Sequence, residues 1–342
     1  MALNRRTFLL SVPFAATAVA CAGSGQRGHA DGVRELARSE QASAGAPRVL
    51  VLMPETKQTW EVWRGISDEL GKDFRLAAVR VDGTEGAGAI ARALERYRPF
   101  GIVLMNNPTV ALYREYQRTS RAQRFPPAVI VMTSFLEGQA HHVAAATGIS
   151  YEVPLVTVVT NLRKLIATPI DRVGVVHRPG LAGFVADQAQ IAAREQTVLL
   201  RQQVSPRPNS SEIKRAIREL KKTSQAIWVL NDDRLLSPDQ IASGWLPGLN
   251  ERPFVPVIVG AGSLVSPSQS FGTFAVLPDH TALGVQAANL LFDIADHDWL
   301  VPADEAVQLP LSTTTTIDLT QARERFSLRG DALSRVDMIL EL

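Results

Sequence analysis

Several polar side chains stand within two residues of apolar runs that predict buried strands, and together they could hold a small ligand. Asn106 and Asn107 follow "FGIVLM", Ser134 follows "AVIVM", Arg178 follows "RVGVVH" and Asp232 follows "AIWVL". Ligands of α/β sheets bind at the carboxyl ends of strands, so these residues are the candidate contacts. They supply amides, a hydroxyl, a guanidinium fork suited to a carboxylate or phosphate, and a carboxylate for an amine or hydroxyl.

Each candidate also has a structural interpretation. The run Asn231–Asp233 could cap the helix that follows it, because short polar side chains accept hydrogen bonds from free backbone N–H groups. Arg178 could be a solvated loop charge. Trp60 lies near the end of the first strand and could stack on a ligand, whereas Trp63 fits the core better.

The elements that must position these residues alternate in type along the chain. Short apolar runs alternate with segments of helical periodicity, which predicts parallel strands joined by crossover helices. The rhythm restarts after "TGISYEVPL", so we expect two α/β lobes of similar construction, at 47–150 and 151–305, with residues 306–342 returning to the first lobe. A hinge is expected where the chain changes lobes, near residues 150–153 and 302–309.

The N-terminal segment predicts an export signal. Arg5 and Arg6 precede an apolar stretch that is interrupted by Pro13 and is too short to span a membrane, as in a twin-arginine signal. Small residues precede Cys21, the only cysteine of the 342-residue chain, as at a lipoprotein processing site. We therefore predict a signal peptide over 1–20, lipidation of Cys21, and a flexible tether over 21–46. The alternative is an unpaired thiol in a disordered leader.

Composition narrows the classes of function. The formal net charge is +2, and Arg5 and Arg6 account for it, so a processed chain would have no basic excess for nucleic acid. About 290 residues beyond the tether are enough for two lobes stabilised by their own cores.

Two motifs with a chemical interpretation are weak, and a third is absent. "GAGAIA" fits a permissive dinucleotide fingerprint, but its first glycine is separated from the preceding strand and no acid follows the next strand. His141 and His142 are adjacent, so their side chains diverge, and no further metal ligand lies at suitable spacing. No G-x-S-x-G occurs. We expect no cofactor, no metal and no catalysis.

Five segments in order resemble the ABC-type periplasmic substrate-binding proteins of the branch that includes tryptophan and tyrosine binders. These segments are "TGISYEVPL", "DRVGVVHRPG", "AIWVLNDDRLLS", "DHTALGVQAANLLFDI" and the C-terminal "TTIDLTQARERFSL" with "VDMILE". The resemblance implies a clamshell of two doubly wound parallel-sheet lobes joined by a hinge. Asp232 falls on an acidic position of the family, whereas Asn106-Asn107-Pro108, Ser134-Phe135 and Arg178 depart from its pattern, so the family's amino-acid specificity does not carry over.

The resulting expectation is a monomeric, lipid-anchored bacterial protein of the periplasm or cell envelope that captures a small polar molecule for an ABC permease. The membrane partner would be reached through the lipid on Cys21. The alternative is a clamshell-derived sensory or interaction subunit without transport, and a hydrolase using Asp232 is a more distant candidate.

Overall fold

The computed structural model describes residues 33–39, 41–302 and 307–341. Cys21, the predicted signal peptide and the first part of the predicted tether lie outside these residues. Among the described residues, no helix has both the length and the apolar character needed to cross a membrane.

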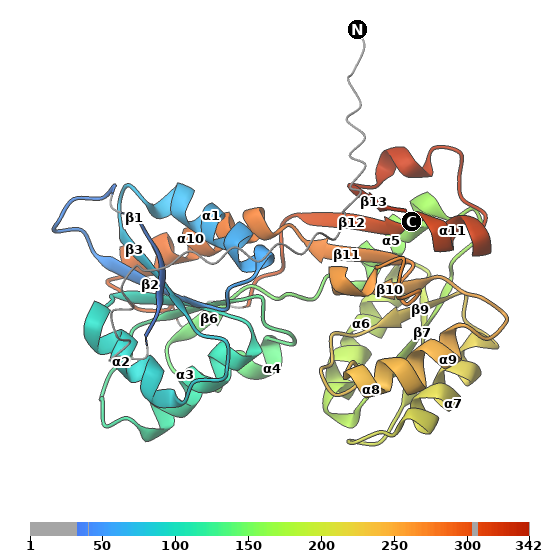
Figure 1. Ribbon diagram of the computed structural model, residues 1–342, viewed down its shortest axis with the longest axis horizontal. Helices are drawn as coiled ribbons and strands as arrows, with labels where there is room; N and C mark the ends of the chain where they lie inside the picture. Colours follow the sequence, from blue (N-terminus) through green and yellow to red (C-terminus); the bar gives the residue numbers. More distant parts are fainter. Residues whose placement is uncertain (1–32, 40, 303–306, 342) are drawn as a thin grey trace, which may run out of the picture. The chain divides into compact units, whose positions relative to one another are not determined.

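Two sheets form the framework of the fold (Figure 1). The first sheet has the order β1-β3-β2-β4-β5-β6 and the second β13-β12-β11-β10-β9-β7-β8. Without β1, β12 and β13, both sheets have the doubly wound order 2-1-3-4-5 with all neighbours parallel. The strands are β1 (Glu35–Ser39), β2 (Arg48–Met53), β3 (Arg75–Arg80), β4 (Gly101–Met105), β5 (Ala128–Val131), β6 (Ala146–Gly148), β7 (Arg172–His177), β8 (Val198–Gln203), β9 (Ala226–Val229), β10 (Val257–Val259), β11 (Phe274–Pro278), β12 (Thr313–Asp318) and β13 (Met338–Leu340).

Helices cover both faces of each sheet, which explains why the central strands are apolar along their whole length. In the first lobe α1 and α10 pack on one face, and α2, α3 and α4 on the other. In the second lobe α5, α6 and α11 pack opposite α7 and α9. The helices are α1 (Lys57–Leu70), α2 (Ala87–Tyr97), α3 (Asn107–Thr119), α4 (Glu137–Ala140), α5 (Leu155–Leu165), α6 (Ala182–Arg194), α7 (Ser210–Lys221), α8 (Pro238–Gln240), α9 (Leu246–Leu249), α10 (His280–Asp296) and α11 (Leu319–Arg325), with short 3₁₀ or π turns at Pro179–Leu181, Ile241–Trp245, Gly262–Leu264 and Ala332–Arg335.

The expected architecture of two doubly wound α/β lobes is confirmed, but three predicted boundaries are wrong. Residues 35–39 of the predicted tether form β1, which pairs antiparallel with β3. Helix α10, assigned to lobe two, packs on α1 in the first lobe. The C-terminal segment 306–342 does not return to lobe one, because β12 pairs antiparallel with β11 and β13 pairs with β12 in the second sheet.

The chain therefore passes between the two sheets three times, over residues 149–154, at residue 279 and between α10 and β12. The crossing predicted near residues 302–309 belongs to the third passage. This passage leads from the first lobe to the second, whereas a return to the first lobe was expected. Hydrogen bonds join the passages: the Ser150 N–H donates to the Gln308 carbonyl at 2.8 Å, and the Asp279 N–H to the Ser312 carbonyl at 3.0 Å. The buried Gln286 side chain of α10 donates to the Gln308 side chain and the Leu309 carbonyl. This polar network gives the passages a defined geometry.

Two glycines allow α1 and α10 to approach closely. A Cβ atom on Gly65 would collide with the carbonyl oxygen of Thr281, and one on Gly284 with that of Val62. Both obstacles are backbone atoms, so a rotamer change cannot relieve the collision.

We predict that Gly65→Ala lowers the free energy of unfolding by about 1–3 kcal/mol, because the added methyl group pushes α10 away from α1. Gly183→Ala is the matched control: Gly183 lies in α6 with open space at its Cβ position, so it should gain up to about 1 kcal/mol from helix propensity. Thermal unfolding of both variants measures the difference. Equal midpoints for the two variants would show that α1 and α10 do not depend on this contact.

Candidate functional site

Arg178 and Asp232 meet at the carboxyl ends of neighbouring strands in the second lobe. Arg178 follows β7 and Asp232 comes after β9, the two strands that flank the point where the strand order reverses. The Arg178 Nε donates to Asp232 Oδ2 at 2.7 Å and its Nη2 to Oδ1 at 2.9 Å. Arg178 and Asp232 were each predicted to contact a ligand, but the structure pairs them with each other.

The Asp232 carboxylate is almost completely buried and has several partners. The residue is 2% exposed, and Oδ1 also accepts from the backbone N–H groups of Arg234 and Leu235 at 3.0 and 3.4 Å. Buried carboxylates need such charged and backbone donors. Asp232 therefore organises the loop after β9 as well as holding Arg178.

In the first lobe, Asn106 and Asn107 have different environments. Asn106 caps α3: its backbone has φ 76° and its side chain accepts from the Thr109 N–H at 3.0 Å. The Asn107 side chain accepts from the Ser134 N–H at 2.9 Å, which connects the loops after β4 and β5. Asn107 and Ser134 consequently lie beside each other, as their places in the sequence predict.

A cavity of about 590 Å³ brings loops of both lobes together. Four of the six predicted ligand residues line it, and Asn106 and Trp60 do not. Trp60 is half-buried on α1, against the core of the first lobe, and lines a separate shallow depression with Trp63. The polar lining of the cavity includes Asn107, Arg114, Ser134, Arg178, Asn231 and Asp232.

Phe135 links the two lobes beside this cavity. It follows β5, has φ 54°, and packs edge-to-face on Phe184 of α6 with ring centroids 5.2 Å apart. Phe184 in turn lies 6.1 Å from Trp228 of β9. A left-handed backbone costs free energy for a bulky residue, so the surrounding contacts must hold Phe135 in this conformation.

A smaller recess of about 20 Å³ shares Asn231 with the larger cavity and extends toward the first passage between the sheets. Glu152 and Asn231 line it together with apolar side chains that include Trp228. Glu152 Oε1 and Asn231 Oδ1 are both buried and have no hydrogen-bond partner among the described residues. Buried acceptors without donors are costly, so this recess lacks a donor group.

The other atoms of these two side chains are held in place. Glu152 Oε2 accepts from the Phe135 N–H at 2.8 Å and from the Ser150 hydroxyl at 3.4 Å. The Asn231 Nδ2 donates to the Gly260 carbonyl at 3.1 Å, and a Cβ atom on Gly260 would lie only 2.6 Å from that nitrogen. Glycine at position 260 thus allows the Asn231 amide to lie where it does.

Burial raises the pKa of the Glu152 carboxyl to about 7. The backbone N–H groups of Phe135 and of Glu152 itself and the Ser150 hydroxyl stabilise the ionised form, and the nearby Glu137 carboxylate opposes it. The physical cause that prevails is the loss of hydration. Glu152 can therefore gain or lose a proton near neutral pH.

Glu152 and Arg114 were not predicted as site residues, and Asn231 was considered only within the run Asn231–Asp233, between helix capping and ligand contact. The available signal for Glu152 was a single acid within the otherwise apolar and small "TGISYEVPL". Asn231 stands one position before the chosen Asp232, and Arg114 is an exposed residue of α3. No cluster of three or more metal-ligating residues occurs in the part of the chain that the structure describes.

Known proteins with the same architecture were found by structure and not by sequence. No family model matches the sequence, and no curated protein matches it significantly. A substrate-binding protein with adhesive properties from Clostridium difficile, in a ligand-free, open structure, has 12% identity and a TM-score of 0.59, over 87% of this chain and all of that one. An ABC domain from Streptococcus pneumonia in complex with L-Trp has 16% identity and a TM-score of 0.54, over 86% of this chain and all of that one.

The chain has the fold of an ABC-type substrate-binding protein. A conserved domain protein from Vibrio cholerae, with 18% identity and a TM-score of 0.54 over 86% of this chain and 99% of its own, has the same architecture. The resemblance inferred from the sequence segments is confirmed at the level of fold.

The raised pKa of Glu152 predicts a pH-dependent stability. Between the ordinary carboxyl pKa and about 7, the unfolded chain has released this proton while the folded chain retains it. Because the folded state binds more protons in this window, the stability that protonated Glu152 contributes is present at low pH and is lost as pH rises toward 7.

Glu152→Gln should remove this decline, since glutamine stays neutral and has nearly the same shape. Denaturant unfolding from pH 5 to 8, with Glu69→Gln on the exposed face of α1 as the control, measures the effect. A wild-type stability that changes with pH in parallel with Glu152→Gln would contradict the assignment.

Proposed function

We propose that this protein is a lipid-anchored, extracytoplasmic solute-binding protein that captures a small polar molecule in the cavity between its lobes. The observation that carries the proposal is the pair of unpartnered acceptors, Glu152 Oε1 and Asn231 Oδ1, in a recess that shares Asn231 with the lining of that cavity. A ligand that donates two hydrogen bonds would satisfy both atoms.

The dimensions of the recess favour an ammonium group. A volume of about 20 Å³ accommodates one water-sized group, and an ammonium group has about that size. An ammonium would also pair with the Glu152 carboxylate and lower its pKa. A bound water is the alternative occupant, because a water can donate to both acceptors.

The outer part of the cavity suits an anionic group at the other end of the same ligand. Arg114 lines the cavity and makes no ion pair among the described residues, whereas Arg178 already pairs with Asp232. The L-Trp complex of the streptococcal ABC domain supports an amine-bearing ligand of amino-acid type as the first class to test. We propose delivery to an ABC permease, with no catalytic step.

One observation supports the alternative, a sensory or interaction subunit of an envelope complex without transport. Arg178 and Asp232 satisfy each other's charges at the strand ends where a ligand would be expected. In that case the recess holds water and no solute binds.

Ligand binding can be tested with a panel of primary amines, amino acids and uncharged polyols, first by thermal shift and then by calorimetry. We expect an amine to bind more tightly as pH rises from 5 to 8, because ionised Glu152 is its partner. Glu152→Gln should weaken that binding about tenfold or more, while Glu69→Gln, an exposed glutamate outside the recess, should not. The alternative function gains support if no compound raises the midpoint.

The lipid anchor is tested at Cys21. Wild-type chain expressed in a bacterium should fractionate with membranes and carry a diacylglycerol on Cys21, and Cys21→Ala should lose both properties. Ser24→Ala is the control within the same segment. Wild-type chain recovered intact from Met1 and without lipid would show that the proposed anchor is wrong.

A further inference from the structure

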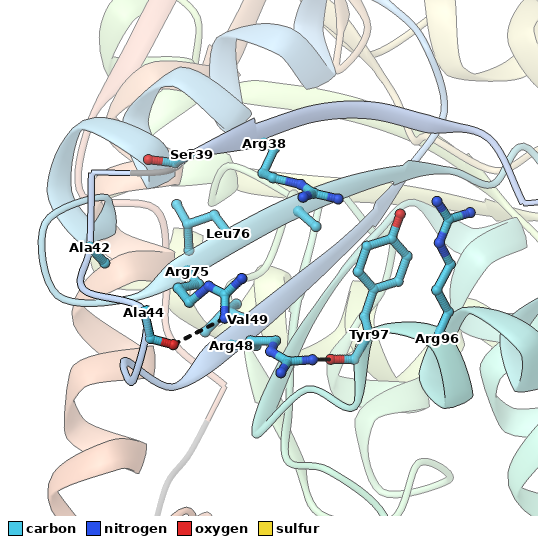
Figure 2. Close-up of a pocket in the computed structure, with 11 residues that line it drawn as sticks. Arg38, Ser39, Ala42, Ala44, Arg48, Val49, Arg75, Leu76, Arg96 and Tyr97 are labelled. Atoms are coloured by element: carbon cyan, nitrogen blue, oxygen red, sulfur yellow. Dashed lines mark hydrogen bonds between the residues drawn. The ribbon is translucent and has the colours of Figure 1, made fainter.

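Four arginines surround a second cavity at the opposite edge of the first sheet. Arg48 and Arg75 are the first residues of β2 and β3, Arg38 lies in β1 and Arg96 in the last turn of α2 (Figure 2). The cavity has a volume of about 410 Å³ and is called the basic pocket below. It lies at the amino ends of β2 and β3, whereas Asn107 and Ser134 follow the carboxyl ends of β4 and β5.

Arg48 and Arg75 are held by backbone carbonyl groups and not by carboxylates. Arg48 Nη1 donates to the Tyr97 carbonyl at 2.9 Å, and Arg75 Nη1 donates to the Ala44 carbonyl at 3.1 Å (Figure 2). A guanidinium has five N–H donors, so one bond fixes each group and leaves most of its donors to other partners. Neither arginine forms an ion pair with a described residue.

Glu35 offsets only part of this positive charge. Its carboxylate accepts from Arg38 Nε and Nη2 at 3.1 and 2.9 Å and also from the Tyr97 hydroxyl. Burial opposes ionisation of Glu35, but the hydrogen bonds from Arg38 and Tyr97, together with the charges of Arg38 and Arg96, lower its pKa. No carboxylate is among the described residues that line the basic pocket.

The buried Tyr97 helps to place the remaining arginine. The Arg96 guanidinium lies 5.3 Å from the centre of the Tyr97 ring, and Tyr97 itself is 7% exposed. The same tyrosine therefore contacts Arg48 through its carbonyl group and Arg96 through its ring. Three positive groups without an ion pair among the described residues, Arg48, Arg75 and Arg96, face one hollow that β2, β3 and α2 build.

We propose that the basic pocket binds the phosphate group of an anionic ligand. Guanidinium forks match the geometry of phosphate oxygens, and several arginines around one cavity can balance a charge of about −2. The phosphate can belong to a soluble phosphorylated compound or to a phospholipid headgroup. The second source rests on the proposed anchor: Arg38 is only 17 residues after Cys21, so an extended segment would keep the pocket within about 60 Å of the lipid.

The test uses the full chain with Cys21→Ala, so that a lipid on the protein does not itself cause membrane binding. Calorimetry at low ionic strength with inorganic pyrophosphate should give one site. Arg96→Gln, which breaks no hydrogen bond of the described residues, and Arg48→Gln with Arg75→Gln should each weaken binding about tenfold or more. Arg121→Gln with Arg124→Gln is the matched control, because it removes two exposed arginines outside the pocket.

A second arm distinguishes the two sources of phosphate. Vesicles of phosphatidylcholine with and without phosphatidylglycerol are tested by flotation. Binding to the anionic vesicles that the pocket variants lose and the control variant keeps identifies a headgroup site. Pyrophosphate binding without vesicle binding identifies a soluble ligand.

The proposal is overturned if pocket and control variants lose binding equally, which would indicate diffuse positive charge only, or if neither probe binds wild-type protein. Failure of the interlobe site would show in the amine titrations and would leave these results unchanged. Thermal midpoints of all variants verify that each is folded.

Discussion

The close contact of α1 with α10 is the constraint on which the two-lobed arrangement depends. Gly65 and Gly284 let the helix backbones touch, and this contact holds α10 in the first lobe although the strands before and after it belong to the second sheet. The chain must therefore pass between the sheets three times. Buried polar groups such as Gln286 and Glu152 lie on or beside these passages, since extended segments there need partners for their backbone groups.

The candidate site follows from that geometry and from the strand order. Doubly wound sheets place the loops after β7 and β9 beside each other, and this brings Arg178 to Asp232. Because this pair is internally satisfied, the chemistry available to a solute lies deeper. Glu152, with its pKa raised to about 7, and Asn231 provide two acceptors in a small recess. A conformational change that rotates the lobes about the passages would alter access to it.

The two lobes and the loops of the site could be predicted from the sequence. The side-chain contacts in the site and the sheet that each C-terminal strand joins could not. Apolar runs such as "RVLVLM" are buried on both sides and specify parallel strands. The loop residues Asn107, Ser134 and Asp232 come two or three residues after strand ends, so their positions could be predicted. Strand β1 escaped detection because "ELARS" is a half-exposed edge strand with little apolar signal. The C-terminal strands were assigned to the wrong lobe because periodicity does not specify which sheet a strand joins. The Arg178–Asp232 pairing and the unpartnered Glu152 oxygen depend on side-chain positions in three dimensions.

A crystal structure of the full chain grown with the amine that most raises its thermal midpoint tests the central claim most directly. The account predicts that the amine nitrogen lies about 2.7–3.2 Å from Glu152 Oε1 and Asn231 Oδ1, with the rest of the molecule in the cavity beside Asn107 and Arg114. A water molecule in that recess, with the amine bound elsewhere on the protein, would contradict it.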